Sequence, residues 1–306
     1  MDPTRQLHLA EATGWRRGLY EDVMATFRAS IVNSIWRTLV ANRPCAARHL
    51  WTAVKPTFQT RAFADFSVRY RDDVLAALET ADEGSSTESP TLPAYDSGDV
   101  DLSPAAFAAL RGQLATFDIV APRLAALFAV CDRALSEGFD GAREGHAATA
   151  PAPEWLDADR GARVTVIDSD AAREAAPDTV EAIEEYHATA FLPSIYRCLA
   201  QWPSYLETVW ADTAPLREVD GDAGFDAARQ AADEVVASFA ERPPVPVAVT
   251  TDGLAAAGVA DPDDALADLR NTFAAFAAGA SGVLPFLHAY AATVDATGER
   301  GWRLAD

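Results

Sequence analysis

Basic charge is scarce in this sequence, and lysine is almost absent. Only Lys55 among the 25 basic residues is a lysine, against 46 Asp and Glu, and the formal net charge is −21 over 306 residues. Because nucleic acids and anionic membranes are polyanions, this excess of acid argues against both as partners. A lysine-poor acidic surface is typical of proteins that fold in concentrated salt, where self-repulsion is screened. We therefore predict a halophilic protein, with an ordinary acidic protein as the alternative.

The sequence also lacks the spaced cysteine and histidine motifs that bind metals or carry redox chemistry. The three cysteines, Cys45, Cys131 and Cys198, form no CxxC pair, and the five histidines show no HxxxH or HExxH spacing. The sequence therefore predicts no metal site, no cofactor and no disulfide framework, and reads the cysteines as reduced thiols. There is no apolar run of about 18 residues and no apolar signal core near the N-terminus, so we expect a cytoplasmic protein.

Helical periodicity is what the sequence has instead, and 49% hydrophobic residues are enough for a sizeable core. Apolar residues recur every four positions over 19–42 and again over 177–202, which predicts one long helix in each range, the second kinked at Pro193. A further helix should begin at each of Pro44 and Pro203. The other predicted helices cover 60–80, 103–117, 120–137, 222–241, 262–278 and 282–296, and the only strand candidate is 245–251.

A duplication organises these helices. At an offset of 160, Ser34, Ile35, Arg37 and Leu39 match Ser194, Ile195, Arg197 and Leu199, and at an offset of 159, Pro44, Trp51, Pro56 and Phe117 match Pro203, Trp210, Pro215 and Phe276. The predicted fold is therefore all-α, a tandem duplication of one helical unit that forms a pseudo-dimer within one chain.

The predicted domains are a first repeat (1–136), a linker (137–161) and a second repeat (162–306), with a polar loop at 81–101. A pocket between the repeats is the natural place for a ligand. We expect a small organic acid there, and the sequence leaves open whether two chains form a homodimer.

Polar residues that interrupt the apolar helices are the first candidates for a site. Ser34 and Ser194 would face each other if both helices line the space between the repeats; alternatively, each serine bonds back to a carbonyl four residues earlier. The matched Arg37 and Arg197 indicate equivalent structural salt bridges. Trp51 and Trp210 are read as core anchors.

Asp118 is the most unusual residue, because it lies in the apolar stretch LATFDIVAPRLAALF (114–128). If buried, its carboxylate should have a raised pKa, which suits a general base. The alternative is that Asp118 caps a helix that begins near Val120. His187 and His288 lie on apolar faces and are read as packed core residues.

The segment PSIYRCLAQWPSYLETVW (193–210), its weaker copy in the first half and residues 114–128 resemble the group I 2-haloacid dehalogenases, the DehI family. The resemblance spans nearly the whole chain. It implies an all-α pseudo-dimer that hydrolyses 2-haloalkanoic acids without a cofactor: an aspartate activates a water, which displaces halide. It places pocket residues at Ile31, Ser34, Ala121, Leu124, Ile195 and Phe276, beside Ser194.

The sequence departs from this family at the reacting centre. The family's catalytic aspartate directly follows the serine that matches Ser194, and here that position is Ile195, which cannot activate water. Asp118 is the one carboxylate that the sequence offers as a relocated base. The alternatives are an inactive relative that binds a small apolar acid between the repeats, or a purely structural helical protein.

Overall fold

The described part of this computed structural model is all helical. It comprises residues 1–2, 4–79, 91–141, 146–158, 160–189, 192–218, 223–280 and 282–304. Its helices are α1 (Gly14–Phe27), α2 (Ser34–Asn42), α3 (Pro44–Phe58), α4 (Arg61–Glu79), α5 (Pro104–Leu135), α6 (His146–Thr149), α7 (Ser169–Ala175), α8 (Pro177–Tyr186), α9 (Ser194–Leu199), α10 (Pro203–Asp212), α11 (Ala214–Glu218), α12 (Gly224–Glu241), α13 (Thr251–Ala256), α14 (Pro262–Ala280) and α15 (Leu284–Thr293).

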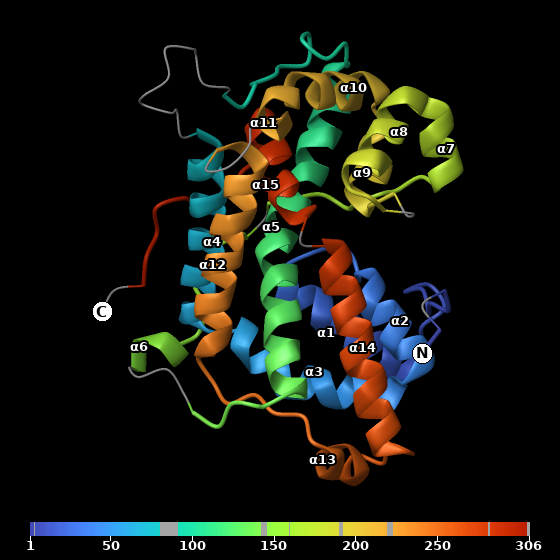
Figure 1. The fold of residues 1–306 in the computed structure, drawn as a ribbon, viewed down its shortest axis with the longest axis vertical. Helices are drawn as coiled ribbons and strands as arrows, with labels where there is room; N and C mark the ends of the chain where they lie inside the picture. Colours follow the sequence, from blue (N-terminus) through green and yellow to red (C-terminus); the bar gives the residue numbers. More distant parts are fainter. Residues whose placement is uncertain are drawn as a thin grey trace.

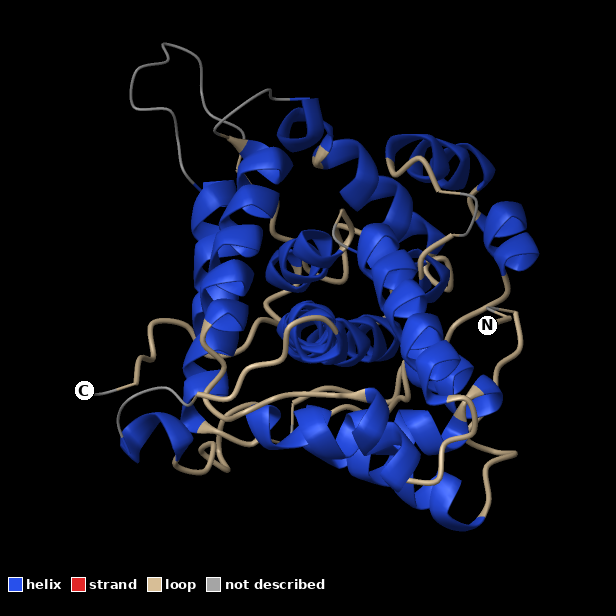
Figure 2. Ribbon diagram, turned by 60° about the horizontal axis from the view of Figure 1, so that its bottom comes forward, coloured by secondary structure: helices blue, strands red, loops and turns tan. Residues whose placement is uncertain are grey.

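Helix α5 runs through the middle of the molecule (Figure 1), and Figure 2 looks along central helices that others surround. It packs against α12, α14 and α15, and nearly every side chain from Leu110 to Leu135 is at least half buried. The sequence predicted two helices here, with Asp118 as the cap of the second. That prediction was wrong, because the helix continues through Asp118 and tolerates Pro122 in its interior. Pro122 cannot donate to the Asp118 carbonyl one turn earlier, and the buried Arg123 Nη1 donates to the next carbonyl, that of Ile119, at 2.7 Å.

Helices α4 and α12 pack side by side along one flank of α5 (Figure 1). Phe66 of α4 and Phe239 of α12 lie 4.5 Å apart between ring centroids, and Phe63 also contacts Phe239. Because α4 comes from the first half and α12 from the second, the apolar core is continuous across the two halves.

Each long helix predicted from fourfold spacing is in fact two helices. The range 19–42 is broken at Arg28, which adopts a left-handed conformation with φ of 51°, and 177–202 is broken at Ala188, with φ of 47°. Pro193 therefore does not kink a helix; it immediately precedes the first turn of α9. The spacing continues across each break because residues on both sides still face the core.

The predicted helix starts at Pro44 and Pro203 are confirmed, as are the helices near 60–80, 222–241, 262–278 and 282–296. The predicted strand at 245–251 is wrong: Val247 forms an isolated bridge with Phe139, and α13 begins at Thr251. Part of the predicted linker is core, since Leu156 is 2% exposed. Residues 81–90 of the predicted loop lie outside the described residues.

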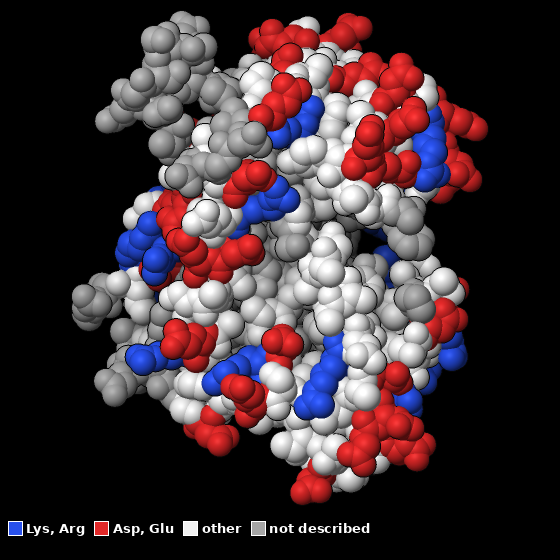
Figure 3. Space-filling view, viewed as in Figure 1, with Lys and Arg blue, Asp and Glu red and all other residues white. Residues whose placement is uncertain are grey.

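Acidic side chains dominate the face in Figure 3, above all over α7, α8 and the region of α13. Two stretches are long and apolar enough to cross a bilayer, Pro104–Leu135 and Pro262–Thr293. In the first stretch, 89% of the apolar window is buried inside the fold. Its two buried charged residues, Asp118 and Arg123, form internal ion pairs, as in a core helix.

Candidate functional site

The predicted pocket residues are distributed over four elements. Ser34 begins α2, Ala121 and Leu124 lie on α5, and Phe276 lies on α14, which contacts both α2 and α5. Ile31 lies in the segment before α2. Ser194 and Ile195 begin α9, which packs against α7 and α10. The structure thus packs α14 against both α2 and α5, and Figure 3 shows a hollow between α9 and α14.

The burial of these residues differs sharply. Ile195 and its counterpart Ile35 are each 1% exposed, whereas Ser34 is half buried and Ser194 is exposed. Each serine is the first residue of its helix, so no helical turn precedes it. The bond predicted from Ser194 to the carbonyl four residues earlier would reach Ala190, which lies outside the described residues. Ile195 is a fully packed aliphatic residue at the point where the family resemblance requires a carboxylate.

The matched arginines bind neutral acceptors. Arg37 Nε donates to Gln6 Oε1 at 3.0 Å, and Arg197 Nε donates to the Ile167 carbonyl at 2.8 Å. The prediction of equivalent salt bridges was therefore wrong, because each arginine donates to an uncharged oxygen. The prediction that Trp51 and Trp210 anchor the core is confirmed, because they are 2% and 8% exposed.

His187 is packed among aromatic rings, as predicted. Its Nε2 lies 2.6 Å from the Tyr196 hydroxyl, and its ring contacts those of Tyr186 and Phe286. Burial, followed by the positive charges of Arg229 and Arg217, lowers the pKa of His187 to about 4. The imidazole is therefore neutral at pH 7.

Asp118 lies at the centre of a buried ionic cluster, formed with Arg71, Arg123, Asp157, Arg160 and His288. Asp118 Oδ1 accepts from Arg71 Nε at 3.1 Å and pairs with His288 Nδ1 at 2.6 Å. Its Oδ2 accepts from Arg71 Nε at 3.0 Å, Arg160 Nη2 at 2.7 Å and the backbone N–H of Gly298 at 3.0 Å. The side chains of Asp118, Arg71 and His288 are 0% exposed.

Asp157 forms the second acidic centre of this ionic cluster. Its carboxylate lies 3.0 Å from Arg123 Nη2, 2.9 Å from Arg160 Nη2 and 3.5 Å from Arg71 Nη2. Burial and the nearby Asp118 carboxylate have opposing effects on the pKa of His288, which lies below its ordinary value, so the ring is neutral at pH 7. Three arginines therefore face two aspartates, and the ionic cluster has a net charge of +1.

The segment after α15 closes the ionic cluster. Arg71 Nη1 donates to the Glu299 carbonyl and Arg160 Nη1 to the Ala296 carbonyl, both at 2.9 Å. A Cβ at Gly298 would lie 2.3 Å from Arg160 Nη2, so only glycine brings its backbone N–H this close to Asp118. The ionic cluster thus fixes the chain end against α4 and α5.

The expectation that burial raises the pKa of Asp118 was wrong. Burial alone raises it, but the charge of Arg71, the hydrogen bond with His288 and the charge of Arg160 together outweigh burial and hold the pKa far below its usual range. A carboxylate with five donor contacts and so low a pKa is a weak base. The partners were missed because they are distant in sequence. Arg123, a second charge five residues away in the same apolar stretch, was the available signal for a buried ion pair.

Metal ligation finds no support among the side chains described: no group of three or more His, Cys, Asp or Glu lies together. The three cysteines are free thiols, two of them buried. Burial raises the pKa of Cys198 to about 12, so this thiol stays protonated.

Comparisons with known proteins bear on this site. A family model described as "Halocarboxylic acid dehydrogenase DehI" matches residues 30–190, which is more than half of the chain. No curated protein sequence matches at a significant level. Similar solved structures are a D-2-haloacid dehalogenase mutant, the complex of such a mutant with D-2-CPA, and the complex of the enzyme with L-LA. Each has a TM-score of 0.72 and 18–19% identity, covers 94% of this chain and 95% of its own, and shows a common fold.

Proposed function

The chain belongs to the DehI family, and from this premise we propose that it acts on small 2-halogenated carboxylic acids, breaking the carbon–halogen bond by attack of water. The family match over residues 30–190 carries this proposal. Those residues include α2 and α5 with Ser34, Ala121 and Leu124, and also Ile31 before α2.

We place the substrate between the start of α2, the middle of α5, the end of α14 and the start of α9. The hollow between α9 and α14 in Figure 3 supports this position. Four predicted pocket residues have aliphatic or aromatic side chains, Ile31, Leu124, Ile195 and Phe276, which suits a dry pocket for the alkyl part of the acid.

Turnover should be slow, because Ile195 replaces the water-activating aspartate of the family. Loss of a general base typically costs about a hundred- to ten-thousand-fold in rate. Binding and exclusion of water from the pocket remain available to the reaction. Binding of the acid without turnover is the second candidate function, and the full burial of Ile195 is the observation that favours it.

We also propose that the pocket lies on a pseudo-two-fold axis between repeats 1–136 and 162–306, joined by 137–161. Equivalent contacts support the duplication. Leu7 N–H donates to the Arg37 carbonyl, and Ile167 N–H donates to the Arg197 carbonyl, each pair exactly 160 positions from the other. The edge-on ring pairs Trp36–Trp51 and Tyr196–Trp210 also correspond.

Reciprocal contacts between the halves support the two-fold axis. Arg111 donates to the Asp295 carbonyl at the end of α15, while Arg270 donates to the Leu135 carbonyl at the end of α5. Arg111 and Arg270 match at an offset of 159. A symmetric interface requires that such contacts occur in both directions.

Halide release tests the proposed function. The protein is incubated in concentrated potassium sulfate with 2-bromopropionate, and free bromide is measured against a heat-denatured sample. Slow release that saturates with substrate is expected. No release together with a raised melting temperature in 2-bromopropionate would favour binding alone. The absence of both bromide release and thermal stabilisation would contradict both candidate functions.

A further inference from the structure

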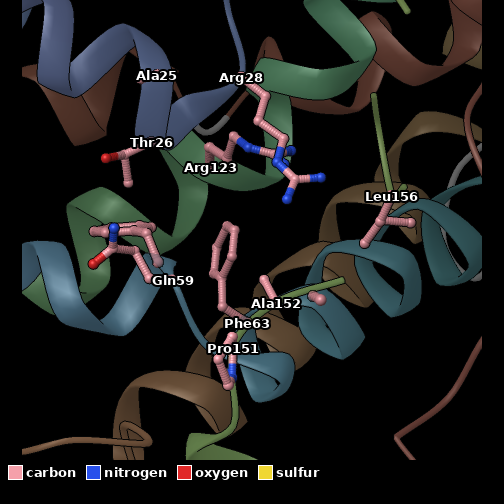
Figure 4. A pocket seen from close by; sticks show the side chains of 11 residues that line it. Ala25, Thr26, Arg28, Gln59, Phe63, Arg123, Pro151, Ala152 and Leu156 are labelled. Carbon is pink, nitrogen blue, oxygen red and sulfur yellow. The ribbon is translucent and has the colours of Figure 1, made fainter. Parts of the chain in front are cut away.

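A second cavity lies in the first half, apart from the predicted pocket. It has a volume of about 250 Å³ and is bounded by the end of α1, the junction of α3 and α4, the middle of α5 and residues 151–156. Figure 4 shows Arg28 and Arg123 approaching each other at one side of it, with the ring of Phe63 pointing toward them.

The charge around this cavity is unbalanced. Arg123 belongs to the ionic cluster, which has a net charge of +1, and Arg28 adds a second positive charge close to it. Excess positive charge beside a cavity favours an anion as its occupant. In a chain with a net charge of −21, such a local excess of positive charge is conspicuous.

Arg123 also has an unused donor. Its Nη1 is bound to the Ile119 carbonyl and its Nη2 lies beside Asp157, but its Nε is buried without a hydrogen-bond partner, and the residue is 3% exposed. Arg28 is partly committed, since its Nη1 and Nη2 donate to the carbonyls of Glu154 and Pro153. An anion in the cavity would give the Arg123 Nε its missing acceptor.

Besides the two arginines, the cavity is lined by the polar Thr26 and Gln59 and otherwise by apolar side chains. Phe58, Phe63 and Leu156 are buried at 2–3% exposure and line the cavity together with Ala152. Inorganic anions gain nothing from such walls, whereas a short alkyl chain does. The combination fits a small monocarboxylate with an apolar tail.

The second half of the chain lacks both guanidinium groups. At the offsets of the duplication, Arg28 corresponds to Ala188 and Arg123 to Gly282. Ala188 repeats the left-handed backbone of Arg28 without the side chain, so the turn does not require an arginine. The charge is therefore specific to this cavity and is not needed to build the repeat.

We infer that this cavity binds a small monocarboxylate, with its carboxylate between Arg123 Nε and Arg28 and its alkyl group against Phe58, Phe63 and Leu156. The site is separate from the α2–α9 pocket, and the inference does not depend on the proposed reaction.

Calorimetric titration of propionate into the full chain, at constant potassium sulfate, tests this inference. Saturable binding is expected in the wild type, with at least about a ten-fold loss of affinity in Arg28→Gln, which removes a charged donor, and in Ala152→Leu, which fills the cavity. Arg17→Gln is the matched control, because Arg17 lies exposed on α1, the helix that ends just before Arg28, and it should bind as the wild type does.

Ala152→Leu keeps the test valid if Arg28→Gln fails to fold, because it changes no charge. Arg123→Met should fold, since its loss leaves two arginines facing two aspartates, and should bind propionate at least about ten-fold more weakly. Absence of saturable binding, undiminished binding in both Arg28→Gln and Ala152→Leu, or equal binding of neutral propionamide would overturn the inference. The inference would also be overturned if chloride bound as tightly as propionate and the same variants abolished chloride binding.

Discussion

His288 Nδ1 and Asp118 Oδ1 lie 2.6 Å apart although 170 positions separate them in sequence, and both side chains are fully buried. Asp118 is also bound by two arginines and a backbone N–H, so its negative charge is fully used in holding α5, α15 and the chain end together. The residue that the sequence offered as a base is thus a structural anion.

Asp118→Asn should lower the free energy of unfolding by about 3–5 kcal/mol, because it leaves three arginines facing the single carboxylate of Asp157. Chemical unfolding in high salt measures this. Asp22→Asn is the control: Asp22 pairs with Lys55 near the surface and should cost about 1 kcal/mol or less. Normal stability of Asp118→Asn with lost halide release would instead make Asp118 the base.

Acid should destabilise the protein through His187. Its pKa of about 4 in the folded state lies below the value of about 6.5 for an unfolded histidine, so protons favour the unfolded state as the pH falls below about 6.5. His187→Phe introduces the residue type that stands at the matching position of the first half, Phe27. It should reduce the loss of stability between pH 7.5 and 5.5 by about 1 kcal/mol. His8→Gln, at an exposed position, should leave that loss unchanged. An identical pH dependence in His187→Phe and the wild type would refute this assignment.

The net charge of −21 predicts that the fold requires salt. The screening length grows from about 3 Å at 1 M salt to about 30 Å at 0.01 M, so acidic side chains repel one another across the surface in dilute buffer. Circular dichroism should show loss of helix on dialysis to 0.01 M potassium chloride, and sucrose should not replace the salt. An unchanged helical spectrum would exclude a halophilic fold.

Helix content and the helix starts at Pro44 and Pro203 could be predicted because apolar spacing and prolines are local signals. The breaks at Arg28 and Ala188 could not, since neither residue is a glycine or proline and each is held in the left-handed region by its surroundings. Residues 103–137 were divided in two because Asp118 and Pro122 are typical of a helix start, yet the buried arginines satisfy Asp118 within one continuous helix.

The candidate site was predictable only in part. The match of Ile195 with Ile35 and the family resemblance together predict that Ile195 stands where the family has its catalytic aspartate. The ionic cluster around Asp118 draws its partners from α4, residues 157–160, α15 and Gly298, and no short sequence window contains that set.

Restoring the missing carboxylate tests most directly the claim that this chain keeps a DehI-type reaction site at the start of α9. Bromide release from 2-bromopropionate is compared in the wild type, Ile195→Asp and Ile35→Asp, each per folded molecule. Ile35 is the control because it matches Ile195 in the first repeat and is equally buried. The account predicts about a hundred-fold or greater gain in Ile195→Asp and none in Ile35→Asp. Equal rates in the two variants, or no release from any of the three proteins, would contradict it.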